Sequence, residues 1–458
     1  MYIEQLYTSC LAEAAYYIES EGEAVIIDPL RETEPYIELA EKRGAKIKYV
    51  FETHFHADFV SGHIDLAKKV NATIVYGPQA NTNYKVYNAK DGEEFKVGKL
   101  TLRVLHTPGH TPESSCYLLL DESEKEHAIF TGDTLFVGDV GRPDLLDGVM
   151  TKEELASMMY DSLNKKIKTL PDDVIVYPAH GPGSACGKNI GKETFSTIGE
   201  QKKFNYALKD MSREEFIKEL TEGILPPPQY FFEDARINRM GYDPIELVMK
   251  ENRKPLTLES FKAEVAKGAL MLDTRMPDDF EKGFVPGALN IGLNGQYAVW
   301  VGTLIDIKQP LVLITEVGKE DESILRLARV GYENVIGYLE GGVAAWDAKL
   351  DVIKSITAEQ MKAEVNSGLM VLDVRKPSEW NISHVKDAVF TPLAEMPGNL
   401  NSFDKAKPYL VHCGGGYRSM MAISLMKKHG FKNLMNIYGG FGAMQEAGLE
   451  IVSEEVAV

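Results

Sequence analysis

The second half of the chain contains an internal repeat with a period of about one hundred residues. The sequence Leu256-Thr-Leu-Glu-Ser-Phe leads to Leu270-Met-Leu-Asp-Thr-Arg275, and Ile356-Thr-Ala-Glu-Gln-Met leads to Leu369-Met-Val-Leu-Asp-Val-Arg375. Each copy runs from a helix with a capping threonine into an apolar strand that ends in Asp-x-Arg. Short buried strands alternating with helices predict α/β domains with parallel sheets, here over residues 256–350 and 356–458.

The first half reads as a third domain, over residues 1–245. A chain of 458 residues is too long for a single core and predicts roughly three domains. Short apolar runs alternate with polar turns and predict these strands: Ala24–Asp28, Tyr49–Thr53, Leu100–Leu105, Ala128–Thr131 and Val174–Tyr177. Residues 200–235 predict helix, with a capped start at Ser212 and a stop at Pro226–Pro228, before a polar connector around Met249–Pro255.

The overall composition excludes several classes of protein. Fifty basic against 68 acidic residues give a net charge of −18, which disfavours an extended nucleic-acid-binding surface. No apolar run approaches the ~18–20 residues of a membrane span, and the first residues do not resemble a signal peptide. The four cysteines are widely and irregularly spaced, so we expect a reducing, cytoplasmic setting in which any reactive cysteine is catalytic.

Histidines and aspartates follow the predicted strands of the first domain. His54, His56 and Asp58 lie within five residues, and three further candidates follow later strands: His110 in Pro-Gly-His, Asp133 in Thr-Gly-Asp and His180 in Pro-Ala-His. Imidazole and carboxylate donors suit zinc, iron and manganese about equally, so the donors alone do not choose a metal. Three other histidines fall on no such motif and are expected to be ordinary core or surface residues: His63, His106 and His127.

The order and spacing of these motifs resemble the metallo-β-lactamase superfamily over about residues 1–235. The resemblance implies an αββα sandwich. In the two-metal hydrolases of that superfamily the residue after Asp58 is usually a histidine, whereas Phe59 here cannot bind a metal. This favours a one-metal site on His54, His110 and Asp133, a two-histidine, one-carboxylate set typical of non-haem Fe(II) oxygen chemistry. His56, Asp58 and His180 then become groups that orient ligands or bind water.

The flanking residues are similar to the persulfide dioxygenase branch of the superfamily. The similarity lies in Thr53–Asp58, Pro108–Pro112, Thr131–Asp133 and Gly141–Asp144. It implies one Fe(II) per chain on His54, His110 and Asp133, with zinc as the alternative in the isolated protein. It also implies that Arg142 binds the anionic part of a thiol persulfide, because a guanidinium pairs with carboxylates in two-point fashion. The alternative for Arg142 is a structural salt bridge.

The second repeat carries His412-Cys-Gly-Gly-Gly-Tyr-Arg-Ser419 between a predicted strand and a helix. Loop amides and the helix N-terminus favour a negatively charged sulfur, and the glycines allow that cradle. The segment resembles the rhodanese active site, which implies that Cys413 carries sulfur and Arg418 adds positive charge. The matching framework residues are Asp373, Arg375, Trp380 and His384. The alternatives are an inert buried cysteine and a phosphatase loop; the four residues between Cys413 and Arg418 favour sulfur transfer.

The first repeat resembles the same fold without its chemistry. The strand Leu311–Thr315 leads to Glu316 or a neighbour at the cysteine position, and Phe284 replaces the histidine common in that motif. A carboxylate is no sulfur nucleophile, so this repeat is predicted to be inactive, with a spacer or docking role.

The other cysteines carry weaker expectations. Cys186 lies six residues after His180 and would suit a persulfide relay at the metal site, with an unreactive loop cysteine as the alternative. Cys116 is expected in the core, and nothing assigns Cys10.

The whole arrangement resembles bacterial persulfide dioxygenase–sulfurtransferase fusions. It implies oxidation of a low-molecular-weight thiol persulfide by O2 to sulfite, coupled to thiosulfate and persulfide interconversion in sulfide detoxification. The carrier thiol (glutathione, coenzyme A or bacillithiol), the direction of sulfur transfer and any homo-oligomer stay open. The alternatives are a glyoxalase II-like zinc thioester hydrolase and a non-catalytic sulfur-carrier or sensor scaffold. A metal-dependent nuclease fits poorly with the acidic charge.

Overall fold

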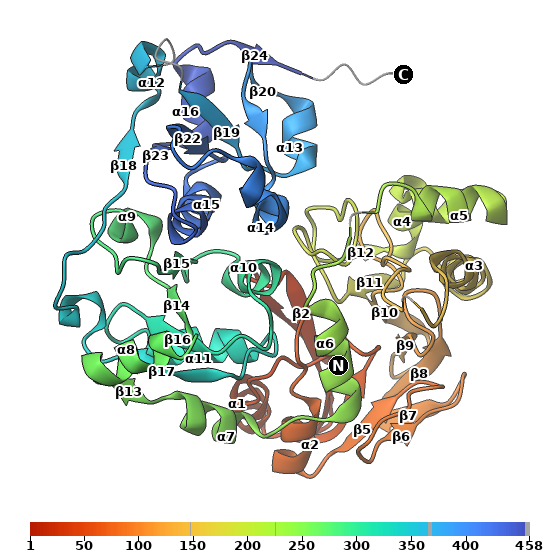
Figure 1. The fold of residues 1–458 in the computed structure, drawn as a ribbon. Helices are drawn as coiled ribbons and strands as arrows, with labels where there is room; N and C mark the ends of the chain where they lie inside the picture. The colour runs from red at the N-terminus through yellow and green to blue at the C-terminus, as the bar shows by residue number, and fades with distance from the viewer. Residues whose placement is uncertain (147, 225, 365–368, 454–458) are drawn as a thin grey trace. The chain divides into compact units, whose positions relative to one another are not determined.

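The structure is a computed structural model that describes residues 1–146, 148–224, 226–364 and 369–453. Its contacts divide the chain into two compact units, Met1–Val248 with Ala328–Gly331, and Met249–Leu327 with Tyr332–Val458. Figure 1 labels the elements of both. Within the described ranges, no helix combines the length and apolar character that a membrane span requires.

The first unit is built on two six-stranded sheets (Figure 1). The first sheet has the order β1 (Tyr2–Thr8), β2 (Glu13–Ser20), β3 (Glu23–Ile27), β4 (Lys46–Glu52), β5 (Thr73–Tyr76) and β6 (Tyr87–Asn88). The second has the order β12 (Ser196–Thr197), β11 (Ile175–Pro178), β10 (Glu126–Gly132), β9 (Ser115–Leu120), β8 (Leu100–His106) and β7 (Glu94–Val97). One apolar cluster between the sheets takes residues such as Tyr16, Phe51, Tyr117 and Phe130 from both.

Helices cover the outer faces of these sheets. The first sheet packs on α1 (Glu34–Arg43) and α2 (His63–Val70) through a cluster that contains Tyr36 and Leu66. The second packs on α3 (Lys152–Ser162), which continues as a π-helix over Leu163–Ile167, on α4 (Ile198–Phe204) and on α5 (Arg213–Thr221). Two helices complete the unit and lead out of it: α6 (Phe231–Met240) and α7 (Ile245–Asn252). The αββα sandwich predicted for this half is confirmed.

The predicted helical stretch over residues 200–235 is interrupted. Ser212 is the N-cap of α5 and forms a capping box with Glu215, as the sequence predicts. The helix ends at Thr221, however, and α6 starts only after the prolines, so the described part of the stretch holds three α-helices and a short 3-10 helix at Tyr206–Leu208 rather than one helix. Proline removes a backbone donor and disfavours helix in the residue before it, which explains the break.

The second unit contains two five-stranded parallel sheets of the same order. The first repeat has β13 (Pro255–Leu256), β17 (Val335–Leu339), β16 (Leu311–Ile314), β14 (Leu270–Asp273) and β15 (Leu289–Asn290). The second has β18 (Lys354–Ile356), β23 (Leu434–Ile437), β22 (Tyr409–His412), β19 (Met370–Asp373) and β21 (Val389–Phe390), beside a small pair β20 (His384–Val385) and β24 (Ile451–Val452). The internal repeat read from the sequence is therefore a repeat of topology.

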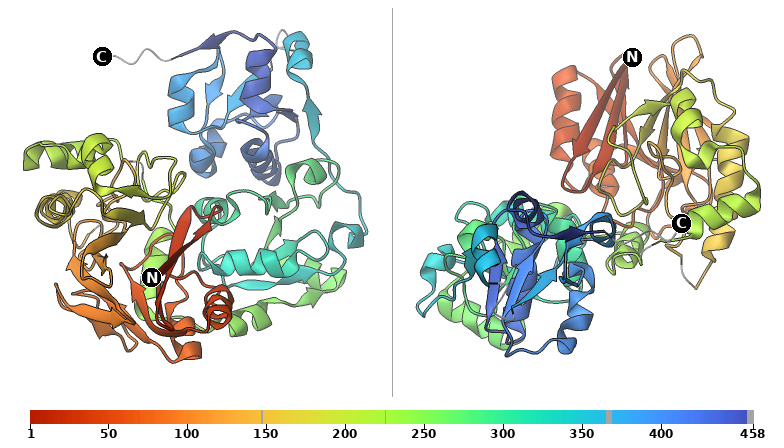
Figure 2. Two further views of the ribbon diagram at one scale, coloured as in Figure 1. Left: turned by 180° about the vertical axis from the view of Figure 1, so that it is seen from behind. Right: turned by 90° about the horizontal axis from the view of Figure 1, so that it is seen from above.

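Helices flank both sheets, as the C-terminal repeat shows in Figure 2. Those of the first repeat are α8 (Leu258–Ala266), α9 (Pro277–Phe280), α10 (Tyr297–Leu304) and α11 (Glu320–Ala328). Those of the second are α12 (Ala358–Glu364), α13 (Pro377–Ile382), α14 (Met396–Asn399), α15 (Tyr417–Lys428) and α16 (Gly440–Glu446).

The strand registers identify equivalent positions in the two repeats. Asp273 pairs with Ile314, and Asp373 pairs with His412. Ile314 therefore corresponds to His412, and the next residue, Thr315, corresponds to Cys413. The sequence placed the counterpart of the cysteine at Glu316 or a neighbour, and the strand registers identify it as the neighbour Thr315.

Candidate metal centre and sulfur-transfer loop

The predicted metal ligands follow the carboxyl ends of four strands in the first unit. His54, His56 and Asp58 come after β4, His110 after β8, Asp133 directly after β10 and His180 after β11. All six side chains are buried. A rigid pair of sheets thus presents these loops together, which is where functional side chains are commonly held.

Three donors converge on one point in the structure. His54 Nε2 lies 3.9 Å and His110 Nε2 lies 3.4 Å from Asp133 Oδ2. One donor atom from each of the three residues lies within 4.8 Å of the other two. The structure therefore brings together the set His54, His110 and Asp133 that the resemblance implied.

The hydrogen bonds of the two histidines test whether this point fits a metal. His110 Nδ1 donates to the carbonyl oxygen of Arg142 at 2.7 Å, which leaves a lone pair on Nε2. His110 Nε2 and both carboxylate oxygens of Asp133 have no hydrogen-bond partner among the described residues. The lone pair of His110 Nε2 and the carboxylate of Asp133 repel each other at this distance. A cation bound between them would replace that repulsion with attraction to both, so the donor set fits a bound metal.

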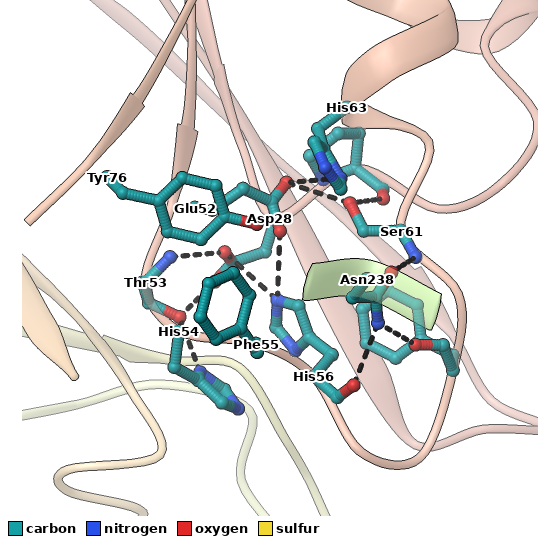
Figure 3. A network of polar contacts seen from close by, with 12 residues as sticks. Asp28, Glu52, Thr53, His54, Phe55, His56, Ser61, His63, Tyr76 and Asn238 are labelled. Carbon is teal, nitrogen blue, oxygen red and sulfur yellow. Dashed lines mark hydrogen bonds and ion pairs between the residues drawn. The ribbon is translucent and has the colours of Figure 1, made fainter. Parts of the chain in front are cut away.

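His54 is oriented by two hydrogen bonds that lead through Thr53 to Asp28, at the end of the neighbouring strand β3 (Figure 3). Its Nδ1 lies 2.9 Å from Thr53 Oγ1, and that hydroxyl donates to Asp28 Oδ2 at 2.8 Å. Because the threonine proton is used on Asp28, His54 Nδ1 is the donor and Nε2 again keeps its lone pair. Burial, followed by the neighbouring histidines His56 and His110, lowers the pKa of His54, so the imidazole is neutral, as a ligand must be.

A second group of donors lies on the other side of Asp133. His180 Nε2 is 3.4 Å from Asp58 Oδ2 and 3.6 Å from Asp133 Oδ1, and His56, Asp58 and His180 form a compact trio. Burial opposes protonation of His180, but the carboxylates of Asp58 and Asp133 raise its pKa overall. The trio is placed to hold or orient groups around the metal.

Phe59 follows Asp58, at the position where the resemblance implies a histidine in the two-metal hydrolases. Its side chain is fully buried, and its ring packs against that of His56 with centroids 4.3 Å apart. Asn238 on α6 fixes this turn by donating to the carbonyl oxygens of His56 and Phe59, each at 2.8 Å. The ring therefore fills the position with packing rather than with a donor atom.

The sequence reasoning missed a buried acidic cluster behind His56 (Figure 3). His56 Nε2 lies 3.1 Å from Asp28 Oδ1 and 3.6 Å from Glu52 Oε2. Glu52 also accepts from Ser61 Oγ at 2.8 Å and lies 3.8 Å from His63 Nδ1. Burial, together with the charge of Asp28, raises the pKa of Glu52. The available signal was an acidic residue ending each of two otherwise apolar strands, Ile26-Ile-Asp28 and Val50-Phe-Glu52.

Arg142 is already engaged in the structure. Its Nε and Nη2 donate to the two carboxylate oxygens of Asp144 at 2.6 and 2.7 Å, and its Nη1 donates to the carbonyl of Ala185 at 3.2 Å. This is the arrangement of the structural salt bridge named as the alternative. What Arg142 is seen to do is hold His110 through its carbonyl; its role in substrate binding stays a prediction.

Cys186 lies at the metal centre. Its sulfur is within 4.8 Å of donor atoms of Asp133 and His180, and the residue is 1% exposed. Burial, followed by the carboxylates of Asp58 and Asp133, raises the pKa of its thiol. The position of Cys186 suits a persulfide relay at the metal site, whereas its raised pKa disfavours the thiolate that a relay needs. The relay role of Cys186 stays a prediction.

The Cys413 loop joins β22 to α15. The backbone amide of Gly416 donates to Cys413 Sγ at 3.1 Å, and Gly416 has φ +104°, a conformation that favours glycine. Arg418 donates to both oxygens of Glu379, at 2.5 and 2.9 Å, a partner that the sequence did not indicate. The loop thus has the amide contact predicted for a sulfur cradle.

The framework residues around the loop behave as a structural unit. Arg375 pairs with Asp373 at 2.6 Å, and the rings of Trp380 and His384 stack with centroids 3.6 Å apart. The first repeat has the same pair, Arg275 with Asp273, at 2.7 Å.

These sites define the class of the protein. A family model for the metallo-beta-lactamase superfamily matches residues 9–180, and one for the rhodanese-like domain matches residues 257–349 and 357–447. The chain belongs to the metallo-beta-lactamase superfamily and carries two rhodanese-like domains in its C-terminal part.

Individual relatives show which proteins of this class the chain is similar to. The human protein "Persulfide dioxygenase ETHE1, mitochondrial" is 34% identical over 213 residues, which is 45% of this chain and 74% of that protein. The fission yeast "Probable hydroxyacylglutathione hydrolase glo2" is 33% identical over 204 residues, 39% of this chain and 75% of its own length. A solved structure titled as a metallo-beta-lactamase from Staphylococcus aureus is 31% identical, with a TM-score of 0.66, over 74% of this chain and 98% of that one.

Proposed function

We propose that the chain is a persulfide dioxygenase joined to a sulfurtransferase. The observation that carries the proposal is the pairing of a His54, His110 and Asp133 centre, with Phe59 in place of a further ligand, and a cysteine loop at Cys413 in one polypeptide. The similarity to a relative named persulfide dioxygenase supports the first activity. The rhodanese-like match around Cys413 supports the second.

The first reaction converts a thiol persulfide, O2 and water into a thiol, sulfite and two protons. The two sulfurs together lose four electrons and O2 gains them, so the step needs no other oxidant. Bound by His54, His110 and Asp133, one Fe(II) would supply the activation of O2. Thr53 and the carbonyl of Arg142 hold the two imidazoles with Nε2 toward the centre. His180 lies beside Asp58 and Asp133, whose carboxylates raise its pKa and favour a proton on its imidazole.

The second reaction moves one sulfur atom through Cys413. A thiol persulfide and the Cys413 thiol exchange to give the free thiol and a Cys413 persulfide. Sulfite then attacks the outer sulfur, the Cys413 S–S bond breaks, and thiosulfate leaves with that sulfur. The amide of Gly416 stabilises the negative charge on Cys413 when the bond breaks.

A thioester hydrolase is the second candidate, because the fission yeast relative is named a hydroxyacylglutathione hydrolase. The trio His56, Asp58 and His180 provides part of a second metal site. Phe59 argues against it, since two-metal hydrolysis needs both metals held. A Phe59→His variant would supply the missing donor and should raise the bound metal from one to two per chain.

Metal content and O2 uptake test the proposal together. We expect about one iron per chain and O2 uptake with persulfides of glutathione, coenzyme A or another small thiol. His110→Gln should abolish both, whereas His106→Gln should keep both, because His106 bonds the carbonyl of Pro112 in the same loop without facing Asp133. Stoichiometric zinc with thioester hydrolysis and no O2 uptake would refute the proposal.

We expect these reactions in a cytoplasmic setting, and whether the chain forms a homo-oligomer stays open.

A further inference from the structure

The Cys413 loop is attached to the first repeat through Tyr417. Tyr417 opens α15 directly after Gly416, and its hydroxyl donates to the carbonyl oxygen of Gly292 at 2.5 Å. A Cβ atom built on Gly295 would lie 2.4 Å from Tyr417 Cζ, so a side chain at that position and the observed ring position exclude each other. The glycines at 292 and 295 leave the space that the Tyr417 ring occupies.

A second connection to the sulfur itself runs through buried side chains and the half-buried Ser355. Cys413 Sγ lies 3.7 Å from Ser419 Oγ, and Ser419 Oγ donates to Asn436 Oδ1 at 2.8 Å. Asn436 Nδ2 donates to Ser355 Oγ at 3.1 Å, and Ser355 Oγ donates to Glu281. Glu281 is 7% exposed and belongs to the first repeat, where it follows α9. Each group in this series can donate to the next, and the series ends on a carboxylate, which can only accept.

A cavity lies beside the same loop. It has a volume of about 230 Å³ and is lined by Met276–Asp278 of the first repeat, and by Gly415–Tyr417 and Asn436–Gly439 of the second. Asp278 contributes a negative charge to the cavity wall. The cation of the loop, Arg418, is paired with Glu379 and does not neutralise that charge directly.

We propose that the catalytically silent first repeat is a working part of the sulfur-transfer site. It holds the loop in place through Tyr417 and Glu281, and it supplies one wall of the cavity that receives the small sulfur compound. Both residues are positioning residues: Tyr417 fixes the start of α15, whose preceding amide contacts the sulfur, and Glu281 fixes Ser419 through Ser355 and Asn436. The proposal rests on sulfur transfer at Cys413.

The physical reason is the orientation of the cradle. An amide stabilises a sulfur anion only while it points at the sulfur, and three consecutive glycines give the loop wide conformational freedom. Contacts from outside the loop restrict that freedom without occupying the space that the donor and acceptor need.

The test is steady-state sulfur transfer by the full chain, with thiosulfate as donor and cyanide as acceptor. Glu281→Gln and Tyr417→Phe should each lower kcat about fivefold with little change in KM, the effect of one weakened hydrogen bond. Gly295→Val should lower kcat by roughly tenfold or more, because its side chain displaces the Tyr417 ring. The rate at which iodoacetamide alkylates Cys413 should fall in parallel, which a change in global stability alone would not cause.

The cavity wall has its own readout. Asp278→Lys should lower KM for thiosulfate several-fold, because thiosulfate is a dianion and the wall would change from negative to positive. The kcat of this variant should stay near that of the wild type, since Asp278 takes no part in holding the loop.

Matched controls separate these effects from general damage. Glu259→Gln and Tyr338→Phe make the same chemical changes elsewhere in the first repeat and should leave sulfur transfer unchanged. O2 uptake by the metal centre should be intact in every variant.

If the Glu281, Tyr417, Gly295 and Asp278 variants keep wild-type kcat, KM and alkylation rate while Cys413→Ser abolishes transfer, this proposal is wrong and the proposed function stands. If Cys413→Ser itself transfers sulfur normally, the sulfurtransferase half of the proposed function fails, and this proposal with it.

Discussion

The two repeats of the second unit share one fold and differ in one loop. Both have five parallel strands of the same order and an Arg–Asp pair at the end of the equivalent strands β14 and β19, Arg275 with Asp273 and Arg375 with Asp373. After the central strand, β16 or β22, one repeat continues with Thr315-Glu-Val-Gly318 and the other with Cys413-Gly-Gly-Gly416. The framework is therefore independent of the chemistry.

The comparison extends to the details of packing. Gly318 and Gly416 occupy equivalent positions with φ +90° and +104°. The stacked rings of Trp380 and His384 are matched by Phe280 and Phe284, with centroids 4.1 Å apart. A glycine turn and an aromatic pair are thus kept in the first repeat, although that repeat contains no cysteine. This teaches that the glycine conformation at the end of the loop is a property of the fold. The three residues before that glycine, Cys413-Gly-Gly in one repeat and Thr315-Glu-Val in the other, determine whether the loop can carry sulfur.

Cys413→Thr removes the main difference between the two repeats, because threonine is the residue at the equivalent position of the first repeat, Thr315. We expect sulfur transfer to fall by at least ~10³-fold, since a threonine hydroxyl carries no sulfur, while O2 uptake is preserved. Thiosulfate formation from a persulfide should be replaced by sulfite accumulation. The reverse change, Thr315→Cys, should create no activity beside Glu316, and measurable transfer by Thr315→Cys with Cys413→Ser would contradict the comparison.

The residue before the cysteine predicts a difference in pH dependence. Burial, only partly offset by Asp373, lowers the pKa of His412 to about 4, whereas its counterpart is Ile314. The folded state therefore resists protonation at His412, so stability is full above the unfolded-state pKa of ~6.5 and falls as the pH drops toward 4. The expected loss in the opening free energy of the second repeat is about 3 kcal/mol.

Hydrogen exchange of the β22 amides between pH 7 and pH 4 measures that loss. His412→Ile copies the first repeat and should reduce the pH dependence of β22, after correction for the intrinsic exchange rate. An unchanged pH dependence in that variant would show that another group is responsible.

Glycine at the helix entrance provides a prediction that separates stability from chemistry. Gly318→Ala and Gly416→Ala should each lower the unfolding free energy by about 1–2 kcal/mol, because alanine is strained at positive φ. A Cβ at either position meets no atom within 4 Å, so no steric clash adds to this backbone strain. Only Gly416→Ala should also slow sulfur transfer, because its amide contacts Cys413. Urea unfolding and the transfer assay measure the two effects, and equal activity in both variants would argue against the amide contact.

The aromatic pair gives the smallest expected effect. His384→Phe makes the second repeat like the first and should keep the stack on Trp380. It loses the hydrogen bond from His384 Nδ1 to the Trp380 carbonyl, at 3.1 Å, which corresponds to about 1 kcal/mol. Urea unfolding should detect this loss with sulfur transfer unchanged; a large loss of transfer would mean that His384 acts in the reaction.

Much of the fold and the site could be predicted from residue order. Helix caps such as Ser212 and glycines such as Gly416 act locally, so their effect is visible in a few neighbouring residues. The ligand loops could be predicted because each follows an apolar strand. The breaks between α4, α5 and α6 were only partly visible: Ser212 marked the start of α5 and the prolines preceded α6, whereas no predicted signal marked the end of α4 at Phe204.

The missed residues have a common cause. Glu52, Glu379 and Asn238 belong to no motif. The partner of Glu379, Arg418, and the partner of Asn238, the turn at His56–Phe59, are distant in sequence. Glu52 contacts the nearby His56, which also reaches Asp28 at the end of a neighbouring strand. Arg142 shows the same dependence on the fold: the sequence did not indicate its pair with Asp144, and its role in substrate binding stays a prediction.

The sequence by itself determined the kinds of atoms available for chemistry: imidazoles and carboxylates after the strands of the first half, no donor at Phe59, and one sulfur in a glycine loop. Those properties belong to single side chains and do not depend on where the chain goes. The tertiary structure decided which donors meet, which lone pairs they present, and how the first repeat is connected to the Cys413 loop through Tyr417 and Glu281. Such contacts depend on distances between residues far apart in the chain, and only the folded sheets fix them.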